Sequence, residues 1–370
     1  MPQSAFSLAT DLLTSPRESG TDSARQARDR IAGFLEGLGY QLETQRFSFS
    51  TSGLLGFPVF GAGLGWLTLL QIPLLVLPGA PRWAALTVWV LGLLSLLALA
   101  FGLGLGWATL GGETREDANL IATRGGVVRR WIVAHYDTKA QGHSMAGRLV
   151  AVWVVVAASL IMTGLAVVRL WGPLPVWLMA AGTGLAIAGG VLAGRGRLKG
   201  QSPGARDNGS GLLAALVAAE EINDPSVGIL ITGAEEFGLI GARYFAQKCV
   251  ERLAGTEVIN FDTVDEQGTW RLVVHAGNAN QLMERAESRI RGASAIPVRQ
   301  HRLPLGIFVD SLPLSRAGAV AITIARLDWG TLRKIHTSRD TLEGLSLESA
   351  VLAGRIATRM IADCRLPIGD

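Results

Sequence analysis

Long apolar stretches alternate along the chain with segments in which apolar and polar residues recur at the short spacings of helices and strands. Residues 47–81 and 83–112 contain no charged side chain. Within them, residues 54–77 and 83–110 are each long enough to cross a bilayer. Because only a short turn containing Pro and Gly separates the two runs, we predict a transmembrane helical hairpin over residues 52–112.

A second pair of apolar runs follows about forty residues later. Residues 149–168 are uncharged, residues 169–173 contain turn formers, and an apolar run then continues to residue 192. A pair of buried core helices could give this pattern, but runs of this length favour membrane spans. We therefore predict a second transmembrane hairpin over residues 148–194. Four tryptophans lie near the expected span ends, where an aromatic belt would sit: Trp83, Trp107, Trp171 and Trp177.

The rest of the chain shows the shorter periods of a globular domain. Residues 23–38 place apolar side chains at helical spacing, and residues 40–50 alternate as a strand does. Further along, short apolar runs typical of buried strands alternate with helical patterns. The expected elements are strands at residues 118–123, 131–134, 227–231, 257–261, 272–275 and 320–324, helices at 212–222, 242–249, 278–291 and 347–362, and a loop at 297–306.

These elements predict an α/β fold, with a mostly parallel sheet flanked by helices and interrupted by the two transmembrane hairpins. Residues 1–51, 113–147 and 195–370 would together form the globular domain. The first eleven residues lack a basic region leading into an apolar core, so we expect no cleavable signal peptide.

Composition supports a membrane protein. Only 17% of the 370 residues are charged, whereas 49% are hydrophobic. The net charge of +4 suits an anionic lipid surface better than nucleic acid in so apolar a chain. Cys249 and Cys364 have neither metal nor redox spacing, so no disulfide framework is predicted.

Acidic and imidazole side chains gather at the predicted strand ends. Glu235 and Glu236 follow a buried strand, at the edge where open α/β sheets bind their ligands. Adjacent carboxylates there require a cation to compensate them. Imidazole and carboxylate sets suit zinc, and one carboxylate between two such pairs suits two bridged metals. The candidate residues are His135, Asp137, Asp207, Glu235, Glu236, Asp262 and His336.

Each candidate also has a structural interpretation when it is taken alone. His135 could be a core histidine, Asp207 a helix cap, Asp262 a turn residue and His336 part of a surface loop. The other histidines lack carboxylates at useful spacing, and we expect them to be structural or exposed: His143, His275 and His301.

Five short motifs that contain the candidates follow one another along the chain. They are His135-Tyr-Asp137, Gly204-Ala-Arg-Asp-Asn-Gly-Ser-Gly211, Gly233-Ala-Glu-Glu-Phe-Gly-Leu-Ile-Gly-Ala-Arg243, Asn260-Phe-Asp262 and His336-Thr-Ser-Arg-Asp-Thr-Leu342. Together and in this order they resemble the M28 family of zinc aminopeptidases. The resemblance covers residues 16–50 and 117–365, and the hairpins interrupt it.

The resemblance implies a zinc-dependent metallopeptidase, specifically an aminopeptidase that hydrolyses N-terminal residues from peptides. It implies two zinc ions per chain. His135 and Asp262 would hold one ion, Glu236 and His336 would hold the other, and Asp207 would bridge them.

The resemblance also implies roles for residues that do not bind metal. Glu235 would be the general base, and Asp137 would orient the metal-binding histidine two residues before it. Asp310 lies where the family often has a Ser-Asp pair, but Val309 replaces the serine, so Asp310 receives no role. Arg206 stands where many members have an acid, which would change the charge of the pocket but not metal ligation.

Two alternatives remain at this stage. Glutaminyl cyclases, which are acyl transferases, resemble the same fold but use one metal, and the His135–Asp262 pair argues against them. A non-catalytic membrane scaffold or transporter with a relic peptidase domain is the other. All five expected ligands are present here, and the predicted spans carry no charged residue that would mark a transport path.

The charges that flank the spans predict the orientation of the protein. Four spans place all parts of the globular domain on one side, and most of the flanking positive charge lies on that side. Those residues are Arg46, Arg115, Lys139, Arg148, Arg195, Arg197 and Lys199, against Arg82 and Arg169 in the opposite turns. The positive-inside rule then predicts a bacterial inner-membrane protein with a cytoplasmic catalytic domain. Its expected partners are a peptide substrate and membrane lipid, and no nucleic acid.

Overall fold

The chain forms two compact units in the computed structural model, which describes residues 4–363 except residues 78, 106, 276–278 and 303–306. The first, here called the sheet unit, consists of Met1–Phe49, Arg115–Ala140 and Gly200–Asp370. The second, here called the helical unit, consists of Ser50–Thr114 and Gln141–Lys199. Each unit is therefore assembled from segments that are far apart in the sequence.

The sheet unit contains an eight-stranded sheet with the order β1-β2-β4-β3-β5-β8-β6-β7. Strands β4, β3, β5 and β8 at its centre are parallel, whereas β2 and β6 run antiparallel to their neighbours β4 and β8. The sheet is thus mixed, with a parallel centre. The strands are β1 (Gln41–Ser50), β2 (Thr114–Thr123), β3 (Arg130–His135), β4 (Val227–Thr232), β5 (Glu257–Val264), β6 (Thr269–Val274), β7 (Val298–His301) and β8 (Val320–Leu327).

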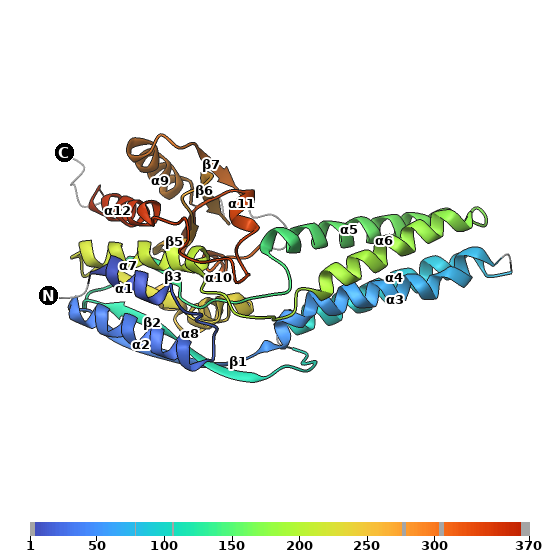
Figure 1. The fold of residues 1–370 in the computed structure, drawn as a ribbon, viewed down its shortest axis with the longest axis horizontal. Coiled ribbons are helices and arrows are strands. Elements are labelled where there is room, and N and C mark those ends of the chain that lie inside the picture. Colours follow the sequence, from blue (N-terminus) through green and yellow to red (C-terminus); the bar gives the residue numbers. More distant parts are fainter. Residues whose placement is uncertain (1–3, 78, 106, 276–278, 303–306, 364–370) are drawn as a thin grey trace. The chain divides into compact units, whose positions relative to one another are not determined.

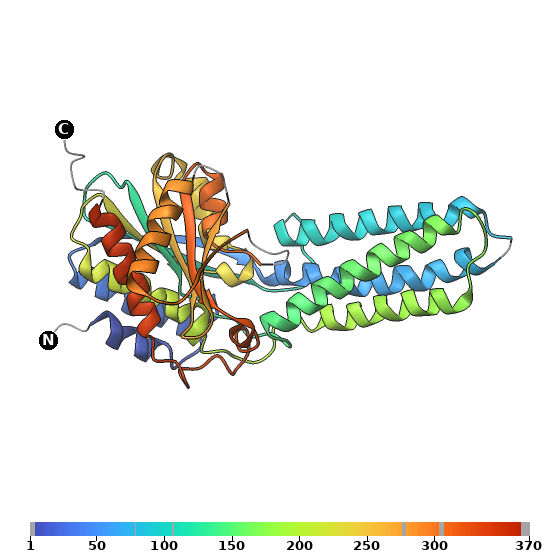
Figure 2. The same cartoon turned by 90° about the horizontal axis from the view of Figure 1, so that it is seen from above.

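Helices cover both faces of the sheet because buried apolar side chains point alternately to either face (Figures 1 and 2). Ile132 and Ala134 of β3 join the larger core, while Trp131 and Val133 join a smaller one. The larger core includes α1 (Ala5–Leu12), α2 (Asp22–Gly37), α7 (Gly211–Glu221), α9 (Asn280–Ala293) and α12 (Glu348–Asp363). The smaller one includes α8 (Ile240–Lys248) and α10 (Ser311–Arg316). The predicted α/β fold flanked by helices is confirmed.

Several elements of the sheet unit, including the short helices α10 and α11 (Trp329–Leu332), differ from the sequence prediction. Part of the predicted loop 297–306 is the strand β7, which pairs in parallel with β6. Its residues Arg299 and Gln300 are exposed, so pairing at the sheet edge, rather than an apolar pattern, makes this segment a strand. Helix α1, which the patterns did not predict, begins after Ser4, whose hydroxyl caps it by accepting the N–H of Ser7. The predicted start of α9 at residue 278 lies outside the described residues.

The helical unit consists of four long apolar helices that pack side by side (Figures 1 and 2). They are α3 (Gly56–Val76), α4 (Arg82–Leu105), α5 (Met145–Val168) and α6 (Val176–Gly194). By length and composition all four could cross a membrane. Large apolar side chains such as Trp66, Phe101 and Trp153 point outward and are more than half exposed. This distribution is typical of a bundle whose outer surface faces lipid.

Small residues and side-chain hydrogen bonds between helices hold this bundle together. A Cβ atom at Gly190 of α6 would lie 2.7 Å from the carbonyl oxygen of Gly61 in α3, so the two backbones approach closely. The indole N–H of Trp89 in α4 donates to the hydroxyl of Thr163 in α5 over 2.8 Å. Close backbone packing and interhelical hydrogen bonds are the interactions that associate helices in lipid.

Arg17, in the segment between α1 and α2, links the N-terminal part of the sheet unit by hydrogen bonds to the loops beside the strand ends. Its side chain is 1% exposed. The guanidinium donates to the carbonyls of Leu12 (3.0 Å), Tyr136 (2.8 Å), Pro203 (2.7 Å) and Gly204 (3.1 Å). Burial lowers the pKa of Arg17 to about 10, so it stays charged at neutral pH. It joins three segments that are distant in sequence.

We predict that Arg17→Met destabilises the protein strongly, because several buried carbonyls lose a charged donor. Hydrogen bonds to charged groups contribute about 1.5–3 kcal/mol each, so a loss of about 3 kcal/mol or more is expected. Thermal unfolding in detergent measures it. Arg25→Met is the matched control, since the side chain of Arg25 is 61% exposed and pairs with Asp22 on the surface of α2. Equal shifts of the two variants would contradict the role of Arg17.

Candidate metal centre

The strand order brings most of the candidate residues to one edge of the sheet. Strand β3 lies between β4 and β5, and the three run parallel. His135 ends β3, Glu235 and Glu236 follow β4, and Asp262 lies near the end of β5. The carboxyl ends of parallel strands share one edge, which is where open α/β sheets bind ligands. Neighbouring strands therefore supply neighbouring side chains.

Asp137 joins His135 to the glutamate pair. It is fully buried, and its two carboxylate oxygens accept the backbone N–H groups of Glu235 (3.1 Å) and Glu236 (3.2 Å). His135 Nδ1 lies 3.2 Å from the carbonyl oxygen of Asp137 and 3.5 Å from its carboxylate. Asp137 thus positions the backbone of the two glutamates. It also contacts the imidazole of His135, which the resemblance implied that it orients.

A tight turn presents the glutamate pair. Ala234, just before it, has the left-handed backbone conformation with φ 53°, which is uncommon for a residue other than glycine. The N–H of Ala234 donates to the Ser19 hydroxyl over 2.9 Å, which helps to keep this turn in place. Glu235 and Glu236 then form a short helical turn, and both side chains are buried.

Asp207 and Asp262 come from irregular backbone. Asp207 lies in the segment Ala205–Ser210, which follows Gly204 in the left-handed conformation and leads into α7. Asp262 lies where the pairing of β5 with β8 shifts register, between Phe261 and Val264. Bulges of this kind redirect side chains near functional sites.

His336 lies in the loop between the short helix α11 (Trp329–Leu332) and α12, also with a positive φ of 64°. Its Nε2 atom is 3.1 Å from Asp207 Oδ2 and 3.2 Å from Glu236 Oε2. The side chain is 2% exposed. The loop therefore carries an imidazole from the far end of the chain onto the two carboxylates.

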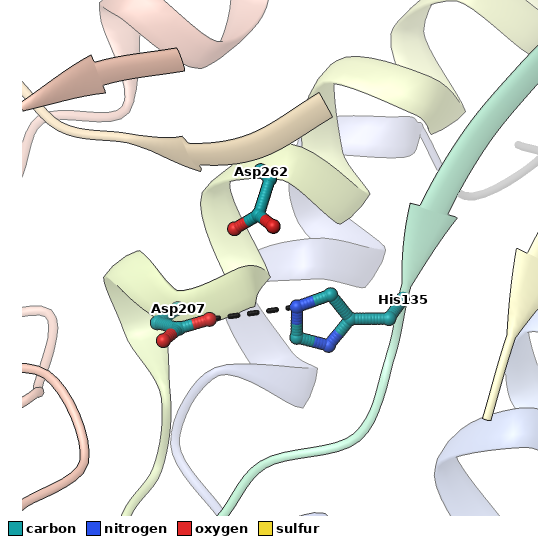
Figure 3. A group of neighbouring side chains, drawn as sticks. All are labelled: His135, Asp207 and Asp262. Atoms are coloured by element: carbon teal, nitrogen blue, oxygen red, sulfur yellow. Dashed lines mark ion pairs between the residues drawn. The ribbon is translucent and has the colours of Figure 1, made fainter. Parts of the chain in front are cut away.

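Two groups of three potential ligands result, and they share Asp207. One group is His135, Asp207 and Asp262, which converge in Figure 3, and the other is Asp207, Glu236 and His336. Within each group the ligand atoms lie within 4.8 Å of one another. His135 Nε2 is 3.4 Å from Asp207 Oδ1, the contact dashed in Figure 3. These are the two sets that the resemblance implied, with Asp207 between them.

The electrostatics of the cluster favour a bound cation. Burial opposes the charge on Asp207, but the contacts with His135 and His336 lower its pKa below the usual range. Burial raises the pKa of Asp262 to about 7 and that of Glu235 well above its usual range. Burial thus disfavours the charged form of these two carboxylates more than the neighbouring His135 favours it, and a divalent ion would add the missing compensation.

Unpartnered atoms at the centre also fit a metal. His135 Nε2 and Glu236 Oε1 are buried and have no hydrogen-bond partner among the described residues. Buried polar atoms of this kind are costly unless a ligand or ion satisfies them. Imidazole and carboxylate together form a donor set that suits zinc. The residues present thus fit two zinc ions, and zinc ligation by them remains a prediction.

Asp310 and the remaining described histidines lie outside both groups. Asp310 is buried, its carboxylate contacts the hydroxyl of Thr232 at the end of β4, and burial raises its pKa to about 6. His275 Nε2 lies 2.7 Å from the Ser311 hydroxyl, and His301 contacts Arg271. These two imidazoles have structural partners, as expected.

Arg206 fastens the Asp207 segment to the loop that carries His336. It is 1% exposed, its Nε lies 3.2 Å from Asp265, and its Nη1 donates to the carbonyl of Thr341 over 2.8 Å. Asp340 completes the contact by accepting the N–H groups of Arg206 (2.9 Å) and Asp207 (3.1 Å). Sequence reasoning predicted only a change of pocket charge at Arg206. Its partners are distant in sequence, so the pattern carried no signal for this contact.

Comparison with solved structures defines the class of fold. A zinc aminopeptidase from Bacillus subtilis has a TM-score of 0.61 and 15% identity, and the match covers 100% of this chain and 97% of that one. A glutaminyl cyclase from Porphyromonas gingivalis has a TM-score of 0.58 and 13% identity, with 98% of each chain covered. The LapA aminopeptidase of Legionella pneumophila has a TM-score of 0.54 and 14% identity, and the match covers 98% of this chain and 72% of that one. The fold is therefore that of these aminopeptidase and cyclase structures.

The sequence comparisons relate part of the chain to a peptidase family. Residues 192–361 match the model of peptidase family M28, which confirms the predicted resemblance over the part that carries Asp207, Glu235, Glu236, Asp262 and His336. Aminopeptidase YwaD of Bacillus subtilis (strain 168) is 29% identical to this chain, over 43% of the chain and 37% of the relative. The match thus spans little more than a third of the length of that curated relative.

We predict that Arg206→Met loosens the metal centre. Removing one partner of a buried ion pair costs about 3–5 kcal/mol, because the remaining carboxylates stay buried without a cation. Thermal unfolding and zinc content after dialysis should both fall. Arg333→Met, an exposed site near the loop that carries His336, serves as the control and should change neither. Retention of wild-type stability and zinc by Arg206→Met would refute this role.

Proposed function

We propose that the protein is a membrane-anchored zinc aminopeptidase with a dinuclear site. The observation that carries the proposal is the pair of ligand groups sharing Asp207, with the unassigned carboxylate of Glu235 beside them. Glu235 Oε2 lies 3.7 Å from His135 Nε2. The family match and the aminopeptidase relatives support the same activity.

The residues would divide the work of peptide hydrolysis as follows. His135, Asp207 and Asp262 would hold one zinc ion, and Asp207, Glu236 and His336 the other. Zinc bound there activates water as a nucleophile and polarises a carbonyl group. Glu235 would take a proton from the attacking water and return it to the leaving amine. Burial raises the pKa of Glu235 above the usual range of a carboxyl group, which favours its uptake of a proton from water.

The charge of the centre favours a substrate with a free amino terminus. Six buried or half-buried carboxylates surround it, and two of them face Arg17 while another contacts Lys139. The six are Asp137, Asp207, Glu235, Glu236, Asp262 and Asp310. A carboxylate of this set that does not bind a metal ion would attract the α-ammonium group of a peptide. This supports an exopeptidase that removes N-terminal residues.

The alternative of a one-metal glutaminyl-cyclase-like acyl transferase is kept because such an enzyme shares the fold. The presence of both ligand groups favours the dinuclear hydrolase. Incubation with peptides that begin in Gln or Leu distinguishes the two. A hydrolase releases the free N-terminal residue, whereas a cyclase converts N-terminal Gln into a ring and leaves the peptide bonds intact.

We predict that Glu235→Gln abolishes turnover and leaves zinc binding intact, because it removes the base and keeps the size of the side chain. Loss of a general base costs about 10²–10⁴-fold in rate. Release of N-terminal residues from peptides and metal analysis of the same preparation measure the two properties. Glu284→Gln on the exposed side of α9 is the control and should keep full activity. Wild-type turnover by Glu235→Gln would rule out the proposed base, and absence of zinc from the wild type would rule out the metallopeptidase.

We also propose that α3 to α6 anchor the protein in a bacterial inner membrane, with the catalytic unit in the cytoplasm. Two of the charges used in predicting this orientation are buried. Lys139 is buried on Glu236, so it does not contribute to the positively charged flank. Arg169, in an opposite turn, is also buried, and it donates to the carbonyls of Leu74 and Leu77 at the end of α3. The remaining flanking arginines and Lys199 still outnumber exposed Arg82, and this supports the positive-inside orientation.

The orientation predicts a definite pattern of topology reporters. A reporter fused at Gly172, between α5 and α6, should respond as a periplasmic site, and one fused at Asp370 as a cytoplasmic site. Activity of each fusion in intact cells measures this, with protein levels compared by immunoblot. The reverse pattern would exclude the cytoplasmic orientation, and identical responses would exclude an odd number of spans between the two positions.

A further inference from the structure

The two ligand groups have the same composition but different surroundings. Each contains one imidazole and two carboxylates, with Asp207 in common. The ion-pair contacts of His135 within the described chain reach carboxylates only, from Asp137 (3.5 Å), Asp207 (3.4 Å) and Glu235 (3.7 Å). Among the described residues, no lysine or arginine forms an ion pair with a member of the first group.

A lysine contacts the second group. Lys139 Nζ lies 2.7 Å from Glu236 Oε2 and donates to the Glu236 carbonyl oxygen over 3.1 Å. The residue is 4% exposed, so solvent does not screen its charge. His336 Nε2 lies 3.2 Å from the same carboxylate oxygen. One oxygen of a candidate ligand is thus shared between an ammonium and an imidazole.

This contact has two consequences for a metal ion. The ammonium occupies a lone pair of Glu236 and neutralises part of the charge that would attract the ion. It also repels the ion directly, and such repulsion is strong between buried charges.

We propose that Lys139 makes the two metal positions unequal, by weakening zinc binding at Asp207, Glu236 and His336 relative to His135, Asp207 and Asp262. This inference rests on the proposed dinuclear function. The protein then fills its positions in order, first the His135 group and afterwards the His336 group. A form with one ion precedes the form with two, and the free zinc concentration sets the balance between them.

A purely structural role for Lys139 would have a different signature. A buried lysine needs a carboxylate partner, and a simple ion pair would affect unfolding without changing the ratio of the two zinc affinities. An orienting role, in which Lys139 holds Glu236 ready for the metal, would change that ratio in the opposite direction. The measurement must therefore report each affinity separately.

The test is a zinc titration of the full-length protein in detergent, after chelator treatment, followed by competition with a chromophoric chelator. Lys139→Met removes the charge and keeps the length of the side chain, and Lys139→Gln removes the charge but keeps a donor for the Glu236 carbonyl. Lys139→Arg retains the charge and is the matched control. Thermal unfolding of each variant establishes that it is folded, and Lys139→Gln replaces Lys139→Met if the latter is not.

We expect two separate binding steps in the wild type. The neutral variants should tighten the weaker step by about tenfold or more, while the tighter step changes by less than about threefold. Lys139→Arg should follow the wild type. In an Asp262→Asn background, where only the second group is complete, removing the Lys139 charge should tighten the remaining step in the same way.

The outcomes separate this inference from the proposed function. The role of Lys139 would be overturned if the neutral variants left both zinc affinities unchanged, or if they lowered the affinity of the weaker step. Either result would leave the dinuclear function standing. Wild-type protein that binds fewer than two zinc ions under saturating conditions would overturn the dinuclear function, and this inference with it.

Discussion

The repulsion among buried carboxylates at one edge of the sheet is the constraint on which the rest of the structure depends. Asp137, Asp207, Glu235 and Glu236 are all less than 9% exposed, so solvent does little to separate their charges. Backbone N–H groups satisfy Asp137, and Lys139 pairs with Glu236. The remaining charge requires cations, which is the physical reason why this edge suits metal ions.

Holding these groups together requires contacts between segments that are distant in sequence. Arg17 joins the N-terminal segment to Tyr136 and Gly204, and Arg206 with Asp340 joins the Asp207 segment to the His336 loop. Each uses a buried side chain to hydrogen-bond backbone groups of distant segments. Such buried networks specify a single arrangement, because any rearrangement would leave charged or polar atoms unpaired.

The apolar helices enter the chain at connections of the sheet and do not interrupt its strands. The first pair lies between β1 and β2, and the second between β3 and β4. Connections tolerate insertions because few buried contacts depend on their length. The second insertion separates His135 from Asp207 in sequence, yet both belong to one ligand group. An insertion can thus add a second unit without removing a ligand from the first.

The sequence by itself determined which helices and strands have a periodic or continuous apolar pattern. It also determined the order of the candidate ligands along the chain. Its apolar runs identified the long helices and the central strands, since burial on both faces leaves a continuous apolar pattern. The family motifs identified all the residues that converge on Asp207. Only the tertiary structure decided the rest. Strand β7 exists because of edge pairing, and Lys139 proved to be a neighbour of Glu236 rather than a flanking surface charge. Arg17 and Arg206 bind backbone groups far along the chain, and the pattern around a single residue holds no information about such partners.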